Sequence, residues 1–119
     1  MNIKYIIIVL GEPYSTFSEI IGKYFKKVKK FKKKIILIGN KSLIIKQLQK
    51  LNLSTSLNEV NDYKKAKKNV INIINVYFGY KKTFSNISIK SNRYIEKSFE
   101  KSLEIIRKEK KKCVLINGP

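Results

Sequence analysis

The sequence predicts an α/β domain, a three-layer arrangement in which a mostly parallel sheet carries helices on both faces. Short β-branched segments alternate with longer segments whose apolar residues recur at helical spacing, as in β-α-β units. The chain has 119 residues and 43% hydrophobic content, enough for one buried core and too little for two. We therefore expect one unit over residues 1–119, with no internal boundary.

The first half of the chain repeats a strand followed by a helix. Residues 3–10 form a nearly continuous apolar run, typical of a strand that is covered on both faces. The segment Gly11-Glu12-Pro13 interrupts it, and apolar residues then recur at helical spacing through about residue 30. Residues 34–39 predict a second buried strand, and a second helix is expected to begin near Ser42.

The middle of the chain is less regular. Residues 52–68 are rich in Asn, Ser and Lys. Within them, residues 55–57 predict a short strand and residues 62–68 a charged surface connection. Residues 69–78 have high β-propensity and predict a strand, and residues 79–90 predict a loop.

The clearest helix lies near the C-terminus. Ser91 or Asn92 is expected to cap it, and it ends in the lysines of residues 108–112. Its predicted core-facing stripe is Ile95, Phe99, Leu103 and Ile106. Residues 113–116 predict a last buried strand, which is followed directly by Asn117-Gly118-Pro119.

Two turns are the candidate functional site. Ligands of open α/β sheets bind beyond the carboxyl ends of the strands, so Gly11, Glu12 and Pro13 are expected on one rim with Asn117, Gly118 and Pro119. Glu12 could contact a hydroxyl or ammonium group of a substrate. Capping of the following helix and ordinary turn chemistry is the simpler interpretation. A sequence that stops at such a turn, before the next expected helix, is typical of part of a larger protein.

The charge of the chain has two explanations. The formal net charge is +19, from 25 Lys, two Arg and eight acidic residues, which fits binding of nucleic acid or another polyanion. However, Lys, Ile and Asn make up 56 of the 119 residues, a bias that A/T-rich codons produce by themselves. The lysine runs follow predicted helices, where they complement the helix dipole. Arginine, which nucleic-acid readers favour, occurs only at Arg93 and Arg107. A nucleic-acid partner is therefore the alternative interpretation.

The composition also bears on membrane insertion, on the cellular compartment and on the role of the single cysteine. The longest N-terminal apolar stretch, Tyr5 to Leu10, is far shorter than the roughly 20 residues that span a bilayer, so no membrane segment is expected. The single cysteine, Cys113, cannot form an intramolecular disulfide, and a cytoplasmic location is the simplest setting. It opens an apolar strand in a chain without histidine, so we interpret it as a small core residue and not as a nucleophile.

Motifs for cofactors are missing from the sequence. No G-x-G-x-x-G follows the first predicted strand, and Gly39-Asn40-Lys41-Ser42 lacks the upstream glycine of a phosphate-binding P-loop. The eight carboxylates form no recognised metal-binding loop. We therefore assign no catalytic, cofactor-binding or metal-binding residue from the pattern of residues.

Three segments, in order, resemble a known family. The first is Ile8 to Pro13, which ends in Gly-Glu-Pro and is followed six residues later by Glu19. The second is Lys34–Gly39 with the helix and leucine-rich turn of residues 43–53. The third runs from Ser91-Asn92-Arg93-Tyr94 through the long helix to Asn117-Gly118-Pro119. Together they are similar to the N-terminal part of 4-hydroxythreonine-4-phosphate dehydrogenase, an enzyme of vitamin B6 biosynthesis.

The resemblance implies a fold like that of isocitrate and isopropylmalate dehydrogenases, here incomplete, and a two-domain enzyme that is a homodimer when complete. It also implies an activity that uses NAD and a divalent metal to oxidise 4-phosphohydroxy-L-threonine, with decarboxylation, on the way to pyridoxal 5'-phosphate. The family's metal- and substrate-binding histidines lie beyond the equivalent of Pro119, so this segment alone is expected to be inactive. Ser15, Phe17 and Ser18 stand where the family has two glycines and a proline, and Asn117 stands where it has threonine.

Overall fold

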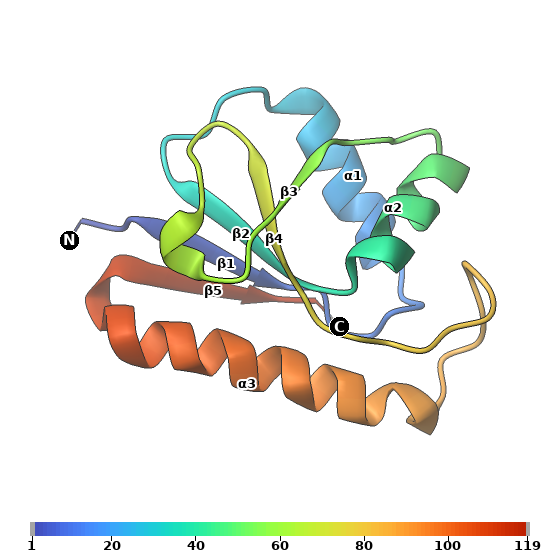
Figure 1. The fold of residues 1–119 in the computed structure, drawn as a ribbon. Helices are drawn as coiled ribbons and strands as arrows, with labels where there is room; N and C mark the ends of the chain where they lie inside the picture. The colour runs from blue at the N-terminus through green and yellow to red at the C-terminus, as the bar shows by residue number, and fades with distance from the viewer. Residues whose placement is uncertain (1, 119) are drawn as a thin grey trace.

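A five-stranded, fully parallel sheet forms the centre of the molecule (Figure 1). The structure is a computed structural model that describes residues 2–118. The strand order across the sheet is β3-β4-β2-β1-β5, and the strands are β1 (Tyr5–Val9), β2 (Lys34–Gly39), β3 (Leu57–Glu59), β4 (Ile71–Asn75) and β5 (Cys113–Asn117).

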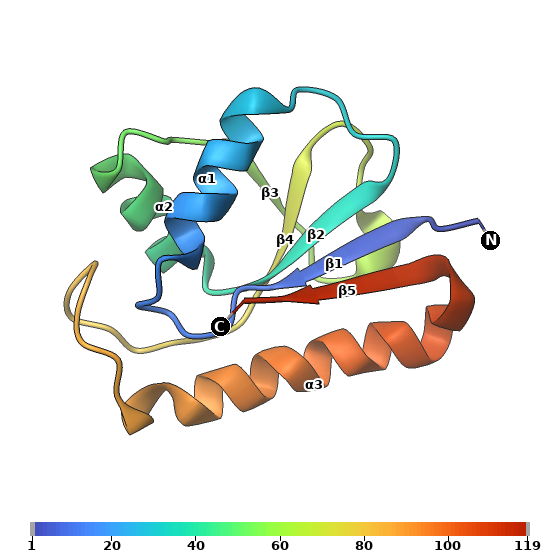
Figure 2. The same cartoon turned by 180° about the vertical axis from the view of Figure 1, so that it is seen from behind.

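Three α-helices cover the two faces of the sheet. They are α1 (Phe17–Lys27), α2 (Lys41–Lys50) and α3 (Asn92–Glu109), with single 3-10 turns η1 (Tyr63–Lys65), η2 (Ile89–Ser91) and η3 (Lys110–Lys112). Helices α1 and α2 lie on one face and α3 on the other, and Figure 2 shows the same separation from behind. The predicted three-layer α/β fold is confirmed. No helix among the described residues is long and apolar enough to cross a membrane.

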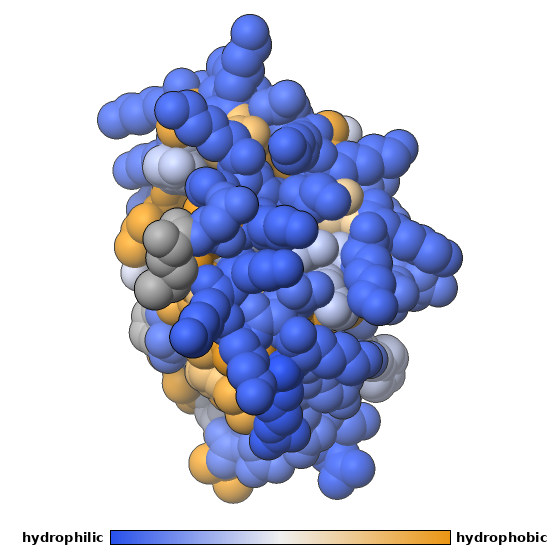
Figure 3. All heavy atoms as spheres, turned by 90° about the vertical axis from the view of Figure 1, so that its left-hand side faces the viewer, coloured by the Kyte–Doolittle hydropathy of each residue, from blue (hydrophilic) through white to orange (hydrophobic). Residues whose placement is uncertain are grey.

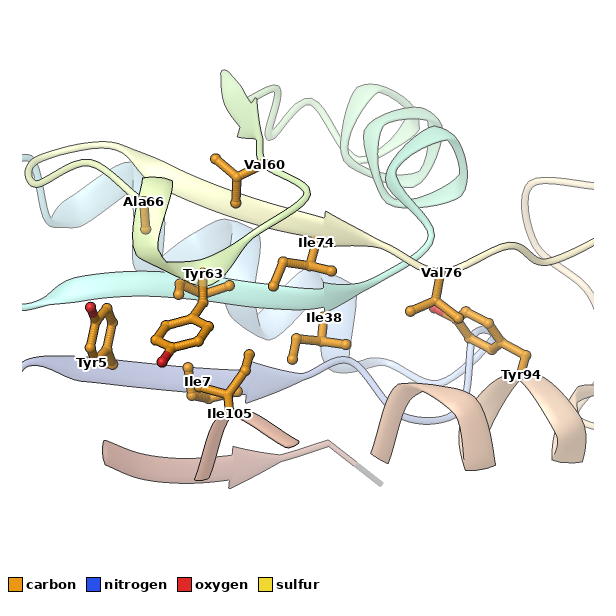
Figure 4. Packing of buried hydrophobic residues seen from close by; sticks show 11 residues of the cluster. Tyr5, Ile7, Ile38, Val60, Tyr63, Ala66, Ile74, Val76, Tyr94 and Ile105 are labelled. Atoms are coloured by element: carbon orange, nitrogen blue, oxygen red, sulfur yellow. The ribbon is translucent and has the colours of Figure 1, made fainter. Parts of the chain in front are cut away.

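The central strands β1 and β2 hold the most buried side chains. Ile7, Ile36, Leu37 and Ile38 have essentially no exposed surface. Because helices cover both faces, alternate residues of one strand enter different cores. Ile36 and Ile38 belong to the core under α3, drawn in Figure 4, whereas Leu37 packs against Ile44 and Leu48 of α2. The continuous apolar runs of the sequence follow from this two-sided burial.

The face of α3 that meets the sheet differs from the predicted stripe. The fully buried residues are Tyr94, Ser98, Ser102 and Ile105, while Leu103 is 40% exposed. The two serines are small enough for the helix to lie close to the sheet. Their hydroxyls donate to helix carbonyls, Ser98 to that of Tyr94 (2.9 Å) and Ser102 to that of Phe99 (2.7 Å). Burial therefore leaves no donor unpaired, and the predicted apolar stripe lies along the flank of the contact.

The connection of residues 62–68, predicted as charged surface, also contributes to the core. Tyr63 and Ala66 are buried under α3, and the Tyr63 hydroxyl donates to Glu109 at 3.0 Å. Burial, and next the hydrogen bond to Glu109, raise the pKa of Tyr63 to about 12. The lysines of this segment remain exposed, so charge and core burial alternate within a few residues.

A buried amide fastens this connection to the sheet. Asn72 of β4 is fully buried, and its Nδ2 donates to the carbonyls of Ile35 and Lys67, both at 2.9 Å. Its Oδ1 accepts from the Lys67 amide at 3.0 Å and from the Asn58 side chain at 2.9 Å. Both N–H donors of this side chain and both lone pairs of its oxygen are therefore used inside the protein.

We expect Asn72→Leu to lower the free energy of unfolding by about 2–4 kcal/mol, because the two amino acids are of similar size and the substitution leaves the buried carbonyl of Ile35 and part-buried backbone groups of Lys67 without this partner. Urea unfolding followed by circular dichroism measures the loss. Asn58→Ala is the control, since it removes one half-buried partner and should cost about 1 kcal/mol or less. A variant Asn72→Leu as stable as the parent chain would show that the amide network contributes nothing.

Candidate functional site

The parallel sheet brings the two predicted turns together. Val9 of β1 is in register with Asn117 of β5, and the Gly118 amide donates to the Val9 carbonyl at 2.8 Å. Residues 11–13 leave the adjacent end of β1, so Gly11, Glu12 and Pro13 lie on the same rim as Asn117 and Gly118. Pro119 lies outside the described residues.

The backbone of these turns requires glycine at two positions. Gly11 has a φ of 72°, in the left-handed region that residues with a side chain rarely adopt. At Gly118 a Cβ atom would lie 2.6 Å from the Leu10 carbonyl oxygen and even closer to the ring of Phe17. The turn after β5 (Asn117–Gly118, the β5 turn) is thus packed closely against the turn after β1 (Gly11–Pro13, the β1 turn) and the start of α1.

Glu12 connects the β1 turn to the segment before α3. Its Oε2 accepts from the Ser91 hydroxyl at 2.9 Å, and its Oε1 accepts from the Tyr14 amide at 3.4 Å. Ser91 occupies the N-cap position of α3, but its side chain does not cap the helix as predicted. The hydroxyl instead donates toward Glu12 and the Ser88 carbonyl. In this structure Glu12 therefore orients the two segments that border the rim.

Asn40 is the central residue of the rim that the sequence analysis did not assign. Its Oδ1 caps α2 by accepting from the Leu43 amide at 2.9 Å, and its Nδ2 donates to the Val76 carbonyl at 3.0 Å. Its backbone amide donates to the Tyr94 hydroxyl at 2.7 Å. An Asn between a predicted strand and a predicted helix is a local N-cap signal that the sequence shows. Its hydrogen bonds to Val76 and Tyr94 join distant segments, and no local pattern predicts them.

Tyr94 reaches this point from α3 and lies beside Val76 (Figure 4). Burial is the main cause that raises the pKa of its phenol to about 12. A Cβ atom on Gly39 would lie 2.8 Å from its hydroxyl oxygen, so the ring sits directly on the end of β2. Tyr94 is thus a buried neutral hydrogen-bonding group at the centre of the carboxyl edge.

The loop after β4 lies against the same rim. Gln47 of α2 donates through Nε2 to the carbonyls of Pro13 (2.8 Å) and Thr83 (3.0 Å). The Tyr14 hydroxyl donates to the Lys82 carbonyl at 3.4 Å, and the Ser42 and Tyr80 hydroxyls are 2.6 Å apart. The predicted loop of residues 79–90 therefore forms a cover over the start of α2 and the β1 turn.

A small cavity with polar and apolar lining lies between the turn after β1 and helix α2. Its volume is about 20 Å³, and Glu12, Ser18, Asn40, Gln47 and Tyr94 are among the residues that line it. Ser18 is 6% exposed, and its hydroxyl has no hydrogen-bond partner among the described residues. The volume suits one water-sized group and excludes a substrate. The rim can orient a ligand that lies outside it but cannot enclose one.

The described residues do not form a metal or nucleophile site. No three side chains of His, Cys, Asp or Glu come together in residues 2–118 to hold a metal ion, so the donor set does not fit the divalent metal that the sequence resemblance implies. Burial, and then Glu109, raise the pKa of the Cys113 thiol, which keeps it protonated at neutral pH. The chemistry available at the rim is hydrogen bonding and positioning.

No protein-family model matches the chain, and no curated protein matches it in sequence. Solved structures do match. The 4-hydroxythreonine-4-phosphate dehydrogenase of Burkholderia phymatum superimposes on all of the chain with a TM-score of 0.75 and 12% identity. The enzyme of Klebsiella pneumoniae covers 98% of the chain, with a TM-score of 0.71 and 13% identity. A Salmonella typhimurium protein with the same assignment also covers 98%, with a TM-score of 0.73 and 15% identity.

This chain spans 37% of the length of each of these three structures. The structural match agrees with the resemblance that the three sequence segments carry. At such identities it is a likeness of fold, and the fold of this chain is that of one portion of the 4-hydroxythreonine-4-phosphate dehydrogenase structures.

Proposed function

We propose that this chain is the amino-terminal portion of an NAD-dependent, divalent-metal-assisted dehydrogenase that oxidises 4-phosphohydroxy-L-threonine, with decarboxylation, in pyridoxal 5'-phosphate biosynthesis. The observation that carries the proposal is the pairing of the Gly11–Pro13 and Asn117–Gly118 turns at one carboxyl edge, in a fold that matches part of such enzymes. In open α/β sheets this edge is the usual place for a ligand crevice.

In this proposal the metal, NAD and the substrate phosphate are held by residues beyond these 119. The chain contains no histidine, and its described carboxylates are not grouped for a metal. The contribution of this portion is one wall of the crevice. Glu12 acts there as a positioning residue, since its carboxylate holds the β1 turn against Ser91. Asn40 and Tyr94 hold the end of β2 in the same way.

The open side of the sheet supports a larger assembly. Strand β5 pairs only with β1 among the described strands, and its outer edge carries unpaired backbone groups. Val114 and Ile116 are 42% and 45% exposed. They are in register with Ile6 and Ile8, on the face that α1 covers. A further element of protein packed on this face, next to α1, would bury these side chains, and this supports a larger assembly.

A hybrid enzyme tests the proposal. This chain replaces the matching portion of the Klebsiella pneumoniae enzyme, and NADH formation from 4-phosphohydroxy-L-threonine, NAD⁺ and a divalent metal is followed by absorbance. We expect the hybrid to form NADH and the chain alone to form none, because the missing groups come from the second portion. Circular dichroism and gel filtration establish that the hybrid is folded. A folded hybrid without activity would contradict the proposal.

Within the hybrid, Glu12→Ala should lower kcat/KM by about tenfold or more, because displacement of a cleft wall by a fraction of an ångström misplaces the substrate. Glu96→Ala is the matched control. This substitution removes the same charge from the exposed surface of α3, away from the turns of the rim, and should leave kcat/KM within about twofold of the parent hybrid. Equal effects of the two substitutions on kcat/KM would show that Glu12 has no special positioning role.

Tyr94→Phe tests the rigidity of the rim in the chain itself. At pH 7 we expect it to lower the free energy of unfolding by about 1–2 kcal/mol, since the buried Asn40 amide loses its acceptor. The folded pKa of about 12 lies above the value of 10 for an unfolded tyrosine. The native phenol therefore stabilises the parent chain fully below pH 10, and this advantage is lost between pH 10 and 12. The difference between parent and variant should shrink over that interval.

Urea unfolding at pH 7, 9 and 11 measures this difference. Tyr77→Phe is the control, because Tyr77 is 79% exposed and its loss should leave stability unchanged at each pH. A Tyr94→Phe penalty that stays constant, or grows, above pH 10 would show that the phenol is not held neutral by burial.

A further inference from the structure

The amino-terminal edge of the sheet, opposite the candidate site, is dominated by lysine. In a parallel sheet every connection returns to the amino ends of the strands, so the segments after α1, η1 and α3 all end at this edge. These segments, together with the last residues of η1 and α3, contain the lysines of residues 29–34, 64–68 and 108–112. Figure 3 views the molecule from this side and shows a mostly hydrophilic surface with scattered hydrophobic patches. Runs that are separate in the sequence therefore form one basic face.

Part of this face is hollowed. A depression of about 370 Å³ lies at the amino ends of β1, β2 and β4, and five lysines line it: Lys4, Lys32, Lys33, Lys34 and Lys68. None of its described lining residues is acidic. The two ion pairs formed by the described residues involve Lys23 and Lys41, so the five lysines of the hollow have no carboxylate partner in that part of the chain.

Ammonium groups gathered around one hollow repel each other, and a bound polyanion removes this repulsion. Each phosphate that a lysine neutralises also releases condensed counterions, which favours binding. The scarcity of arginine argues against sequence-specific contacts to base edges, for which the planar guanidinium group forms paired hydrogen bonds. It does not argue against phosphate contacts, for which lysine serves as a point charge. The structure therefore offers a defined binding place for the polyanion partner that was the alternative interpretation of the charge.

We propose that this lysine hollow binds the phosphate backbone of single-stranded nucleic acid. A hollow of this size admits one backbone, whereas a duplex or a flat bilayer would touch only its rim. The one aromatic residue that lines it, Tyr5, is buried, with the Lys34 ammonium 5.8 Å from the centre of its ring. Bases have no platform on which to stack, so binding is independent of sequence. The proposal does not depend on the dehydrogenase assignment, because it concerns the opposite edge.

Fluorescence anisotropy of labelled oligo(dT) and oligo(dA), titrated with the full chain between about 50 and 200 mM salt, tests the proposal. If the five lysines contact five phosphates, log K should fall with log[salt] with a slope of about −3.5, from about 0.7 per phosphate of a single strand. The two oligonucleotides should bind with equal affinity within about threefold, because only the backbone is contacted. No binding by the parent chain at about 0.15 M salt would overturn the proposal.

Two triple variants separate the hollow from charge in general. Lys4→Gln, Lys32→Gln and Lys68→Gln remove three exposed lysines of the hollow. The control removes three exposed lysines outside it by Lys81→Gln, Lys90→Gln and Lys97→Gln. The hollow variant should bind at least about tenfold more weakly, with a salt slope smaller by about 2, while the control stays within about threefold of the parent. Circular dichroism verifies that both are folded.

Three other outcomes would overturn the proposal. Equal losses in the two triple variants would mean that binding follows total charge and not the hollow. Inorganic tripolyphosphate that displaces the oligonucleotide at equal phosphate concentration would assign the hollow to small polyphosphates. Tighter binding to phosphatidylserine vesicles than to oligonucleotide, lost in the hollow variant, would assign the face to a membrane surface.

Discussion

The common direction of the five strands is the constraint on which the other features of this protein depend. Parallel strands place all their carboxyl ends at one edge, and the returning connections place the lysines of residues 29–34, 64–68 and 108–112 at the other. The Gly11–Pro13 and Asn117–Gly118 turns become neighbours only because β1 and β5 are parallel and adjacent. Residues 29–34 and 108–112 share an edge for the same reason. One topological fact therefore separates a rim suited to a ligand crevice from a basic face suited to phosphates.

Internal hydrogen bonds hold the carboxyl edge in shape. Glu12 with Ser91, Asn40 with Tyr94, and Gln47 with the Pro13 carbonyl each join segments more than 30 residues apart in the sequence. Such bonds are strong in a buried setting but costly if one partner is lost. A rim built in this way is rigid, and it offers a ligand few free polar groups. In the enzyme that we propose, the part of this rim is to position, while groups from elsewhere supply the chemistry.

Buried polar residues mark the places where the sequence analysis and the structure differ. On α3 the apolar periodicity predicted a stripe along the flank of the face that meets the sheet, because Ser98 and Ser102 satisfy their hydroxyls within the helix and permit a close approach to the sheet. Residues 62–68 were predicted as surface, yet Tyr63 enters the core through a bond to Glu109. A prediction from hydropathy places polar side chains such as those of serine and tyrosine at the surface. Only their partners, which are distant in the sequence, make burial favourable.

The amino-acid sequence by itself determined the α/β class, the positions of the central strands and the two turns that follow β1 and β5, because β-branched runs and helical spacing are local signals. It also carried the family resemblance that the structural matches support at the level of fold. Tertiary structure alone decided that Asn40 and Tyr94 meet at the rim and that five lysines enclose one hollow. These features depend on strand order, which arises from long-range packing that no local pattern records.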